Sequence, residues 1–289
     1  ELNTWGCMPH PFGNDVRLRQ RILSFLGEEA LPRIVNLTTP LFSSGLGGRP
    51  ELVASGVILQ VAAARLLITA SHVATDWPGF AIVASDKLSI VAGHWTTLRT
   101  IGSEPGTTAD KADISIIRLE PELADRIPRR EILQLTDVDW DSPVIGRDPF
   151  LLSGYPERRN RGGLRADTFR ARAYTLLLHD ANEVLYAAVG ADPVASAVLP
   201  FEPSEVWTID GQVTAPNLQG ISGGGLWRIP INDGPLGNTR LAAIAVEQHP
   251  KGRHRHVLAT RIRGILRAIH DLHPDLRAAL ELAYRSSVG

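Results

Sequence analysis

The chain has 289 residues, 44% of them hydrophobic and 21% charged, and its 30 basic and 31 acidic side chains give a formal net charge of −1. A chain of this kind can bury a large core, and its near-neutral balance excludes a global field that would recruit nucleic acid or an anionic membrane. No stretch approaches the roughly 18 apolar residues of a membrane span, and the start lacks the basic and apolar segments of a signal peptide. The single cysteine, Cys7, cannot form an internal disulfide, which favours a reducing compartment and predicts a cytoplasmic protein.

The N-terminal segment predicts one helix that precedes the main fold. Asn14 and Asp15 can cap this helix, and we expect it to end near Gly27. Its apolar face comprises Val16, Ile22, Leu23 and Leu26.

Short apolar segments from residue 52 onward predict strands rather than helices. In the first half they cover residues 53–61, 65–70, 80–84, 88–92 and 114–119. After a linker over residues 121–143 they cover 150–153, 171–178, 184–188, 206–209, 226–229 and 242–246, and Asn232-Asp233-Gly234 predicts a hairpin turn between the last two.

The C-terminal segment predicts two helices. Helical spacing of apolar residues begins after Arg261, Pro274 interrupts it, and a second helix covers residues 276–284. The expected packing face of the second helix comprises Leu276, Leu280, Leu282 and Ala283.

A glycine-rich turn, Gly220-Ile221-Ser222-Gly223-Gly224-Gly225, is suited to present one serine hydroxyl beside bare backbone amides. The amides of Gly220 and Ser222 can point at a developing oxyanion, which is acyl-transfer geometry. A serine nucleophile also needs a base and an orienting carboxylate. His72 ends an apolar strand-like run, and Asp113 begins an alternating one, so both partners precede the serine in the chain.

Three motifs resemble those of the chymotrypsin-like (trypsin-fold) serine peptidases: the T-A-x-H segment that ends at His72, the D-I-x-x-I/V-x-L segment that begins at Asp113, and the G-x-S-G-G turn around Ser222. With one cysteine, the chain is most similar to the disulfide-free bacterial members. The resemblance implies an all-β fold of two six-stranded antiparallel Greek-key barrels. It divides the chain into an N-terminal extension (1–50), a first barrel (51–135), a second barrel (136–260) and a C-terminal helical tail (261–289).

The resemblance also implies the role of each residue. Ser222 attacks the scissile carbonyl, His72 takes its proton, and Asp113 holds the imidazole in the correct tautomer, while the amides of Gly220 and Ser222 form the oxyanion hole. No cofactor and no metal is expected. The substrate is a protein or peptide, with Pro216, Asn217, Gln219, Val246 and Glu247 in the substrate pocket. That lining favours an apolar or small side chain before the scissile bond, although Glu247 would draw a basic one if it points inward.

One departure from the family concerns activation. Secreted members carry an aspartate directly before the serine, where it pairs with a new N-terminal amine, but this chain has Ile221. We therefore expect a site that is competent without cleavage or is ordered by another contact, such as a regulatory protein partner. An arginine-rich run over residues 156–172 is either a solvated loop or a docking surface for an acidic partner.

Three alternatives stay open. The chain can be a non-catalytic protein-binding module on the same fold. The turn also satisfies the G-x-S-x-G elbow of an α/β-hydrolase esterase, although that fold places its acid and histidine after the serine. A metal site at His249, His254 and His256 is disfavoured because Arg253 and Arg255 would repel a cation.

Overall fold

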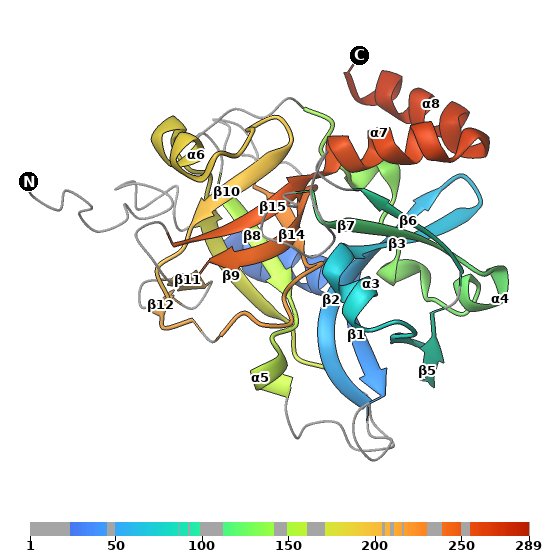
Figure 1. Ribbon diagram of the computed structural model, residues 1–289, viewed down its shortest axis with the longest axis horizontal. Coiled ribbons are helices and arrows are strands. Elements are labelled where there is room, and N and C mark those ends of the chain that lie inside the picture. Colours follow the sequence, from blue (N-terminus) through green and yellow to red (C-terminus); the bar gives the residue numbers. More distant parts are fainter. Residues whose placement is uncertain are drawn as a thin grey trace, which may run out of the picture.

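The computed structural model describes residues 24–44, 50–85, 87–91, 93–98, 112–141, 149–160, 171–203, 206–208, 211–215, 217–229, 239–249 and 255–288. Two antiparallel sheets form the molecule and pack side by side, with helices at the edges (Figure 1). This is the arrangement of a two-barrel trypsin-like fold, as expected from the sequence.

The first sheet has seven strands in the order β5-β4-β1-β2-β3-β7-β6. Their bounds are β1 (Thr38–Ser44), β2 (Pro50–Val61), β3 (Ala64–Ala70), β4 (Ala81–Ala84), β5 (Lys87–Ile90), β6 (Gly93–Leu98) and β7 (Ile114–Leu119). Strand β1 lies in the range that the sequence assigned to an N-terminal extension, yet it pairs with β2 from Thr38 opposite Val57 to Ser44 opposite Pro50. The sequence predicted neither β1 nor β6 as a strand. The sheet has seven strands, whereas six were expected.

The second sheet has eight strands in the order β10-β15-β14-β13-β8-β9-β11-β12. Their bounds are β8 (Pro149–Gly154), β9 (Tyr174–His179), β10 (Ser196–Pro200), β11 (Val206–Thr208), β12 (Gly211–Val213), β13 (Gly225–Arg228), β14 (Arg240–His249) and β15 (His256–Arg261). Again the count exceeds six. The predicted hairpin turn at 232–234 lies outside the described residues, but β13 and β14, which flank it, pair antiparallel as expected.

The helices are short apart from two at the C-terminus. Their bounds are η1 (Leu26–Ala30), α2 (Leu31–Leu37), α3 (Ser71–Asp76), α4 (Pro121–Ala124), η3 (Arg129–Glu131), η4 (Leu135–Asp137), α5 (Glu157–Asn160), α6 (Glu183–Val189), α7 (Ile262–Leu272), η5 (Pro274–Leu276) and α8 (Arg277–Val288). In Figure 1, α7 and α8 run together beside the first sheet, near β6 and β7.

Three helix predictions need correction. The N-terminal helix does not end at Gly27, and helical structure continues to Leu37. The reason is one buried apolar stripe along this segment, which comprises Leu26, Ala30, Ile34 and Leu37. Residues 184–188 are helix α6 rather than a strand. Asn182 caps that helix by accepting a hydrogen bond from the Leu185 amide, and Gly190 ends it in the left-handed conformation. Leu276, in η5, and Leu280, in α8, are buried as predicted, but Leu282 in α8 is 67% exposed.

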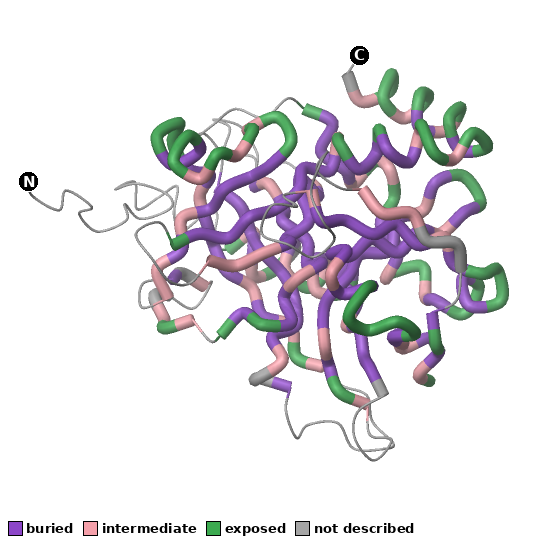
Figure 2. The backbone as a smooth tube through the Cα atoms, viewed as in Figure 1, coloured by how far each residue is buried: buried purple, intermediate pink, exposed green. Residues whose placement is uncertain are grey.

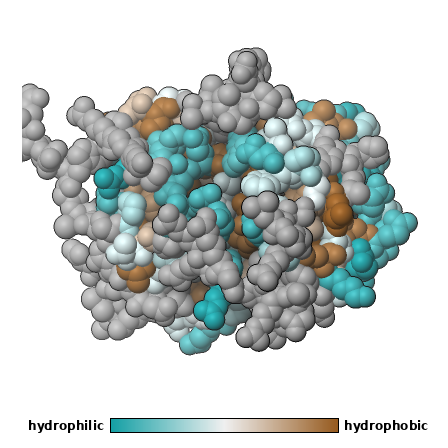
Figure 3. All heavy atoms as spheres, turned by 60° about the horizontal axis from the view of Figure 1, so that its bottom comes forward, coloured by the Kyte–Doolittle hydropathy of each residue, from teal (hydrophilic) through white to brown (hydrophobic). Residues whose placement is uncertain are grey.

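Buried residues lie along the strands of both sheets and form the core (Figure 2). One cluster of buried side chains extends from the first sheet to α7 and α8, and another lies inside the second sheet. Figure 3 shows hydrophobic atoms in separate spots among hydrophilic ones. No helix in the described part of the chain has the combined length and apolar character that crossing a membrane requires.

Candidate active site

His72 stands where strand β3 gives way to helix α3. Ala70 is the last extended residue of the strand, and the chain turns into the helix at Ser71. The imidazole is 31% exposed, so it is anchored in the protein on one side and accessible on the other.

Asp113 lies beside His72 because β3 and β7 pair with Ala70 opposite Ile114. One carboxylate oxygen, Oδ2, is 2.5 Å from His72 Nδ1, and the other, Oδ1, accepts a hydrogen bond from the His72 amide at 3.0 Å. The Asp113 side chain is only 8% exposed. A carboxylate in this place keeps the proton on Nδ1, which leaves Nε2 of the neutral ring as a base.

The backbone at Asp113 is held in an unfavourable conformation. Its φ is +29°, which non-glycine residues rarely adopt. Two neighbouring contacts fix it: the Asp113 carbonyl accepts from the Ser71 amide at 2.8 Å, and the preceding carbonyl of Ala112 accepts from Thr260 Oγ1 at 2.7 Å. Thr260 belongs to β15, so the second sheet braces a residue of the first.

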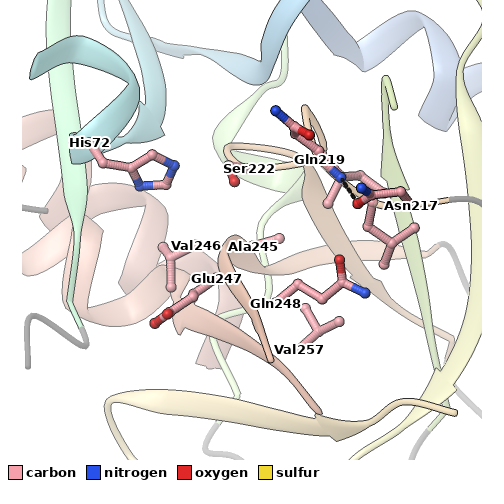
Figure 4. A pocket seen from close by; sticks show the side chains of 11 residues that line it. His72, Asn217, Gln219, Ser222, Ala245, Val246, Glu247, Gln248 and Val257 are labelled. Atoms are coloured by element: carbon pink, nitrogen blue, oxygen red, sulfur yellow. Dashed lines mark hydrogen bonds between the residues drawn. The ribbon is translucent and has the colours of Figure 1, made fainter. Parts of the chain in front are cut away.

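Ser222 lies in the turn that leads into β13, on the other sheet. Its side chain and the His72 imidazole line the same pocket (Figure 4). Among the hydrogen bonds of the described residues, none joins the Ser222 hydroxyl to the imidazole. In proteins without substrate such catalytic hydrogen bonds are often long and tighten only in the complex.

The turn around Ser222 leaves two amides without an acceptor. The amides of Ile221, Gly223 and Gly224 donate to the carbonyls of Leu218, Ala245 and Ile221, at 2.8, 2.7 and 2.8 Å. Within the described residues, the amides of Gly220 and Ser222 have no such partner. These are the two amides that the sequence predicted for an oxyanion hole.

Glycine is required at two positions of this turn. Gly220 has φ +93°, and a Cβ there would lie 2.8 Å from the Glu157 nitrogen and the Tyr155 oxygen. Gly223 has φ +84°, and a Cβ there would lie 2.0 Å from the Ser55 carbonyl oxygen. Any other residue would move the backbone that carries Ser222.

The pocket has a volume of about 280 Å³. Of the predicted lining residues, Asn217, Gln219, Val246 and Glu247 do line it, together with both His72 and Ser222, whereas Pro216 lies outside the described residues. Ala245, Gln248 and Val257, which the sequence also placed around the pocket, line it as well, together with two residues that the sequence did not assign to it, Leu218 and Ile221.

The electrostatics of the pocket favour the charged form of His72. Burial of the imidazole lowers the pKa of His72, but the hydrogen bond and charge of Asp113, and the charges of Asp76 and Glu247, outweigh burial and raise the pKa above 6.5. The neutral ring, which is needed for proton abstraction, therefore forms at a higher pH than in an unperturbed histidine.

Two of the three histidines considered for a metal site, His249 and His256, are described by the structure. His249 contacts Glu247 through Nε2 at 3.0 Å and stacks on His256 with ring centroids 4.4 Å apart. His254 lies outside the described residues. No group of three or more His, Cys, Asp or Glu side chains in the described ranges converges on one point.

The arginine-rich run is only partly described. Helix α5 covers residues 157–160, and residues 161–170 lie outside the described part of the chain. Asn160 is buried and holds Arg172 by accepting from its amide at 2.7 Å. The two readings of this run, solvated loop and docking surface, both stay predictions.

Comparisons with known proteins find similarity among solved structures but none at the level of sequence. No family model and no curated protein matches this sequence. Among solved structures, the inactivated protease paralogue S-I1 of the scabies mite is similar over 84% of this chain and 96% of that chain, with 15% identity and a TM-score of 0.49.

Proposed function

We propose that this protein is a serine endopeptidase of the chymotrypsin-like type that works through Ser222, His72 and Asp113. The observation that carries the proposal is the arrangement at one pocket of an imidazole bonded to a buried carboxylate, a serine hydroxyl facing it, and two amides without acceptors. Each group matches one requirement of acyl transfer.

In the proposed mechanism, Ser222 Oγ attacks the carbonyl carbon of the scissile peptide while His72 Nε2 takes the hydroxyl proton. The amides of Gly220 and Ser222 donate to the oxyanion. The imidazolium then gives its proton to the leaving amine, and an acyl-enzyme remains. Water, activated by His72, hydrolyses the ester and restores Ser222.

The substrate is a protein or peptide, and the lining of the pocket favours a small or apolar side chain before the scissile bond. We favour limited processing of one or a few partner proteins in the cytoplasm. The single cysteine supports this location and the comparison with disulfide-free bacterial peptidases.

A fluorophosphonate probe tests the proposal directly, because it reacts only with an activated serine. We expect labelling at Ser222 in the intact chain, no labelling in Ser222→Ala or His72→Ala, and a loss of about ten-thousand-fold in peptide hydrolysis for Asp113→Asn. Near-normal turnover in Ser222→Ala would exclude the mechanism. Peptide-library cleavage, with Ser222→Ala as control, then defines specificity.

The second candidate is a non-catalytic protein-binding module on the same fold. It is favoured by one observation, the lack of a hydrogen bond between His72 and Ser222 in the described structure. The same probe separates the two functions, because a binding module leaves Ser222 unlabelled at every pH.

A further inference from the structure

The turn that carries Ser222 is fixed through its carbonyl groups. Within one peptide unit the C=O and N–H lie in one plane and point in opposite directions, so a held carbonyl also fixes the amide. The Gly220 amide shares its plane with the Gln219 carbonyl, which accepts from the Glu157 amide at 2.8 Å. The Ser222 amide shares its plane with the Ile221 carbonyl, which accepts from the Gly224 amide at 2.8 Å.

The carbonyls of Gly220 and Ser222 belong to the peptide units that directly follow the two oxyanion peptide units, and both are held by one residue of the other sheet. Ser55, in strand β2, donates from Oγ to the Gly220 carbonyl at 2.9 Å and from its amide to the Ser222 carbonyl at 2.9 Å. Ser55 has no solvent exposure. Water therefore cannot replace either hydrogen bond without opening the contact between the sheets.

The direction of the hydroxyl bond is set by a further partner. Ser55 Oγ accepts from the Tyr155 amide at 2.8 Å, and its single hydrogen is donated to Gly220. The Ser55 carbonyl accepts from Thr69 Oγ1 at 2.8 Å. Because Thr69 lies in β3, the strand that leads into helix α3 and His72, these bonds connect the serine turn to the segment that carries the base.

The residue before the serine cannot provide the ion pair that orders this turn in secreted relatives. Ile221 is 3% exposed and packs against Gly154, where a Cβ would lie 2.3 Å from Ile221 Cγ1. The turn is thus held by an apolar anchor on one side and by Ser55 on the other.

We propose that Ser55 is the positioning residue that keeps the oxyanion peptides in their reactive arrangement, because it holds the peptide unit that follows each of them. It takes the place of an activating ion pair, so the site is ordered without a new N-terminal amine. The inference rests on the proposed serine peptidase function, because it concerns how the same site is kept ready.

Ser55→Ala tests the proposal. It removes the donor to Gly220 and the acceptor for Tyr155 but keeps the amide bond to Ser222. Removal of an oxyanion donor lowers kcat by about a hundred- to a thousand-fold. Loosening both amides without removing either should lower kcat by about ten- to a hundred-fold and leave KM within about twofold.

The matched control is Thr38→Val. Thr38 is also buried, and its hydroxyl contacts the Ile34 carbonyl at 2.9 Å and Ser153 Oγ at 3.1 Å, neither of which belongs to the serine turn. The Thr38→Val substitution removes a buried hydroxyl with two partners, as Ser55→Ala does. Its cost in folding stability should therefore be similar, but it leaves the contacts of the serine turn in place. We expect its kcat to stay near that of the wild type.

A second readout separates positioning from general stability. The affinity of a peptidyl boronic acid, whose tetrahedral adduct occupies the oxyanion site, should fall with kcat in Ser55→Ala. Amide hydrogen exchange in residues 219–223 should accelerate in Ser55→Ala and stay unchanged in Thr38→Val. If Ser55→Ala does not fold, Ser55→Cys replaces it, because a thiol donates and accepts weakly and should give an intermediate kcat.

The proposal is overturned by an unchanged kcat in the Ser55 variant, by an equal fall in Thr38→Val, or by a rise in KM without a fall in kcat. Failure of the proposed function has a different signature. Wild-type protein would then remain unlabelled by the fluorophosphonate, whereas hydrogen exchange would still report whether Ser55 holds the turn.

Discussion

Gly223, directly after the proposed nucleophile, gives the sharpest prediction about the serine turn. Gly223→Ala adds one methyl group to a residue with φ +84°. The new Cβ would lie 2.0 Å from the Ser55 carbonyl oxygen and 2.3 Å from Thr69 Oγ1. The nearest atom belongs to the backbone of β2, so no side-chain rotation relieves the clash.

The magnitude follows from two contributions. A left-handed backbone costs a residue with a Cβ about 1–2 kcal/mol, and overpacking a tight site costs about 1–3 kcal/mol. Gly223→Ala should therefore lower the free energy of unfolding by about 2–5 kcal/mol. It should also slow fluorophosphonate labelling, because the backbone that carries Ser222 must shift.

Gly264→Ala is the control with the opposite sign. Gly264 lies within helix α7, and a Cβ there meets no atom within 4 Å. Alanine in a helix interior is favoured over glycine by about 0.5–1 kcal/mol, so this variant should be more stable than the wild type and label at the same rate. Urea unfolding with parallel labelling measures both. A Gly223→Ala protein with wild-type stability and labelling would refute the packing argument.

The rate of peptide hydrolysis should fall as pH decreases through the pKa of His72, with a midpoint above 6.5, because only the neutral ring can take the serine proton. Glu247→Gln removes one of the charges that raise the pKa of His72, so the midpoint should move to lower pH, most clearly at low salt. An unchanged midpoint would show that Glu247 does not contribute to this pKa. In α8, Leu280→Ala should lower the free energy of unfolding by about 2–5 kcal/mol, since this side chain is 4% exposed. Leu282→Ala should change the stability by less than about 0.5 kcal/mol, because Leu282 is 67% exposed, and equal losses in the two variants would contradict the packing seen here.

The residues of the candidate site were predictable because each stands in a local pattern. His72 ends an apolar strand, Asp113 begins another, and Ser222 lies among glycines, so their types and surroundings are visible in the sequence. The structure brings His72 and Asp113 into contact through the register of β3 and β7, and brings His72 and Ser222 to one pocket. Their catalytic roles stay a proposal.

The elements that were missed depend on long-range contacts or on a weak local signal. Ser55 was not singled out because its four hydrogen bonds reach Thr69 and residues of the second sheet that are about a hundred or more positions away. The only signal was a polar residue inside an apolar strand. Helix α6 was taken for a strand because its apolar run is short, although Asn182 and Gly190 at its two ends are ordinary helix boundaries.

The hydrogen bond from Thr260 to the Ala112 carbonyl connects β15, which lines part of the pocket, to the residue before Asp113. Thr260 follows Val257 in β15, and Val257 lines the pocket. In the proposed peptidase, a side chain that displaced β15 would also disturb the backbone at Asp113, because its strained φ depends on its surroundings. Unsuitable substrates should therefore be rejected through slow turnover rather than weak binding, so discrimination between them is best sought in single-turnover rates.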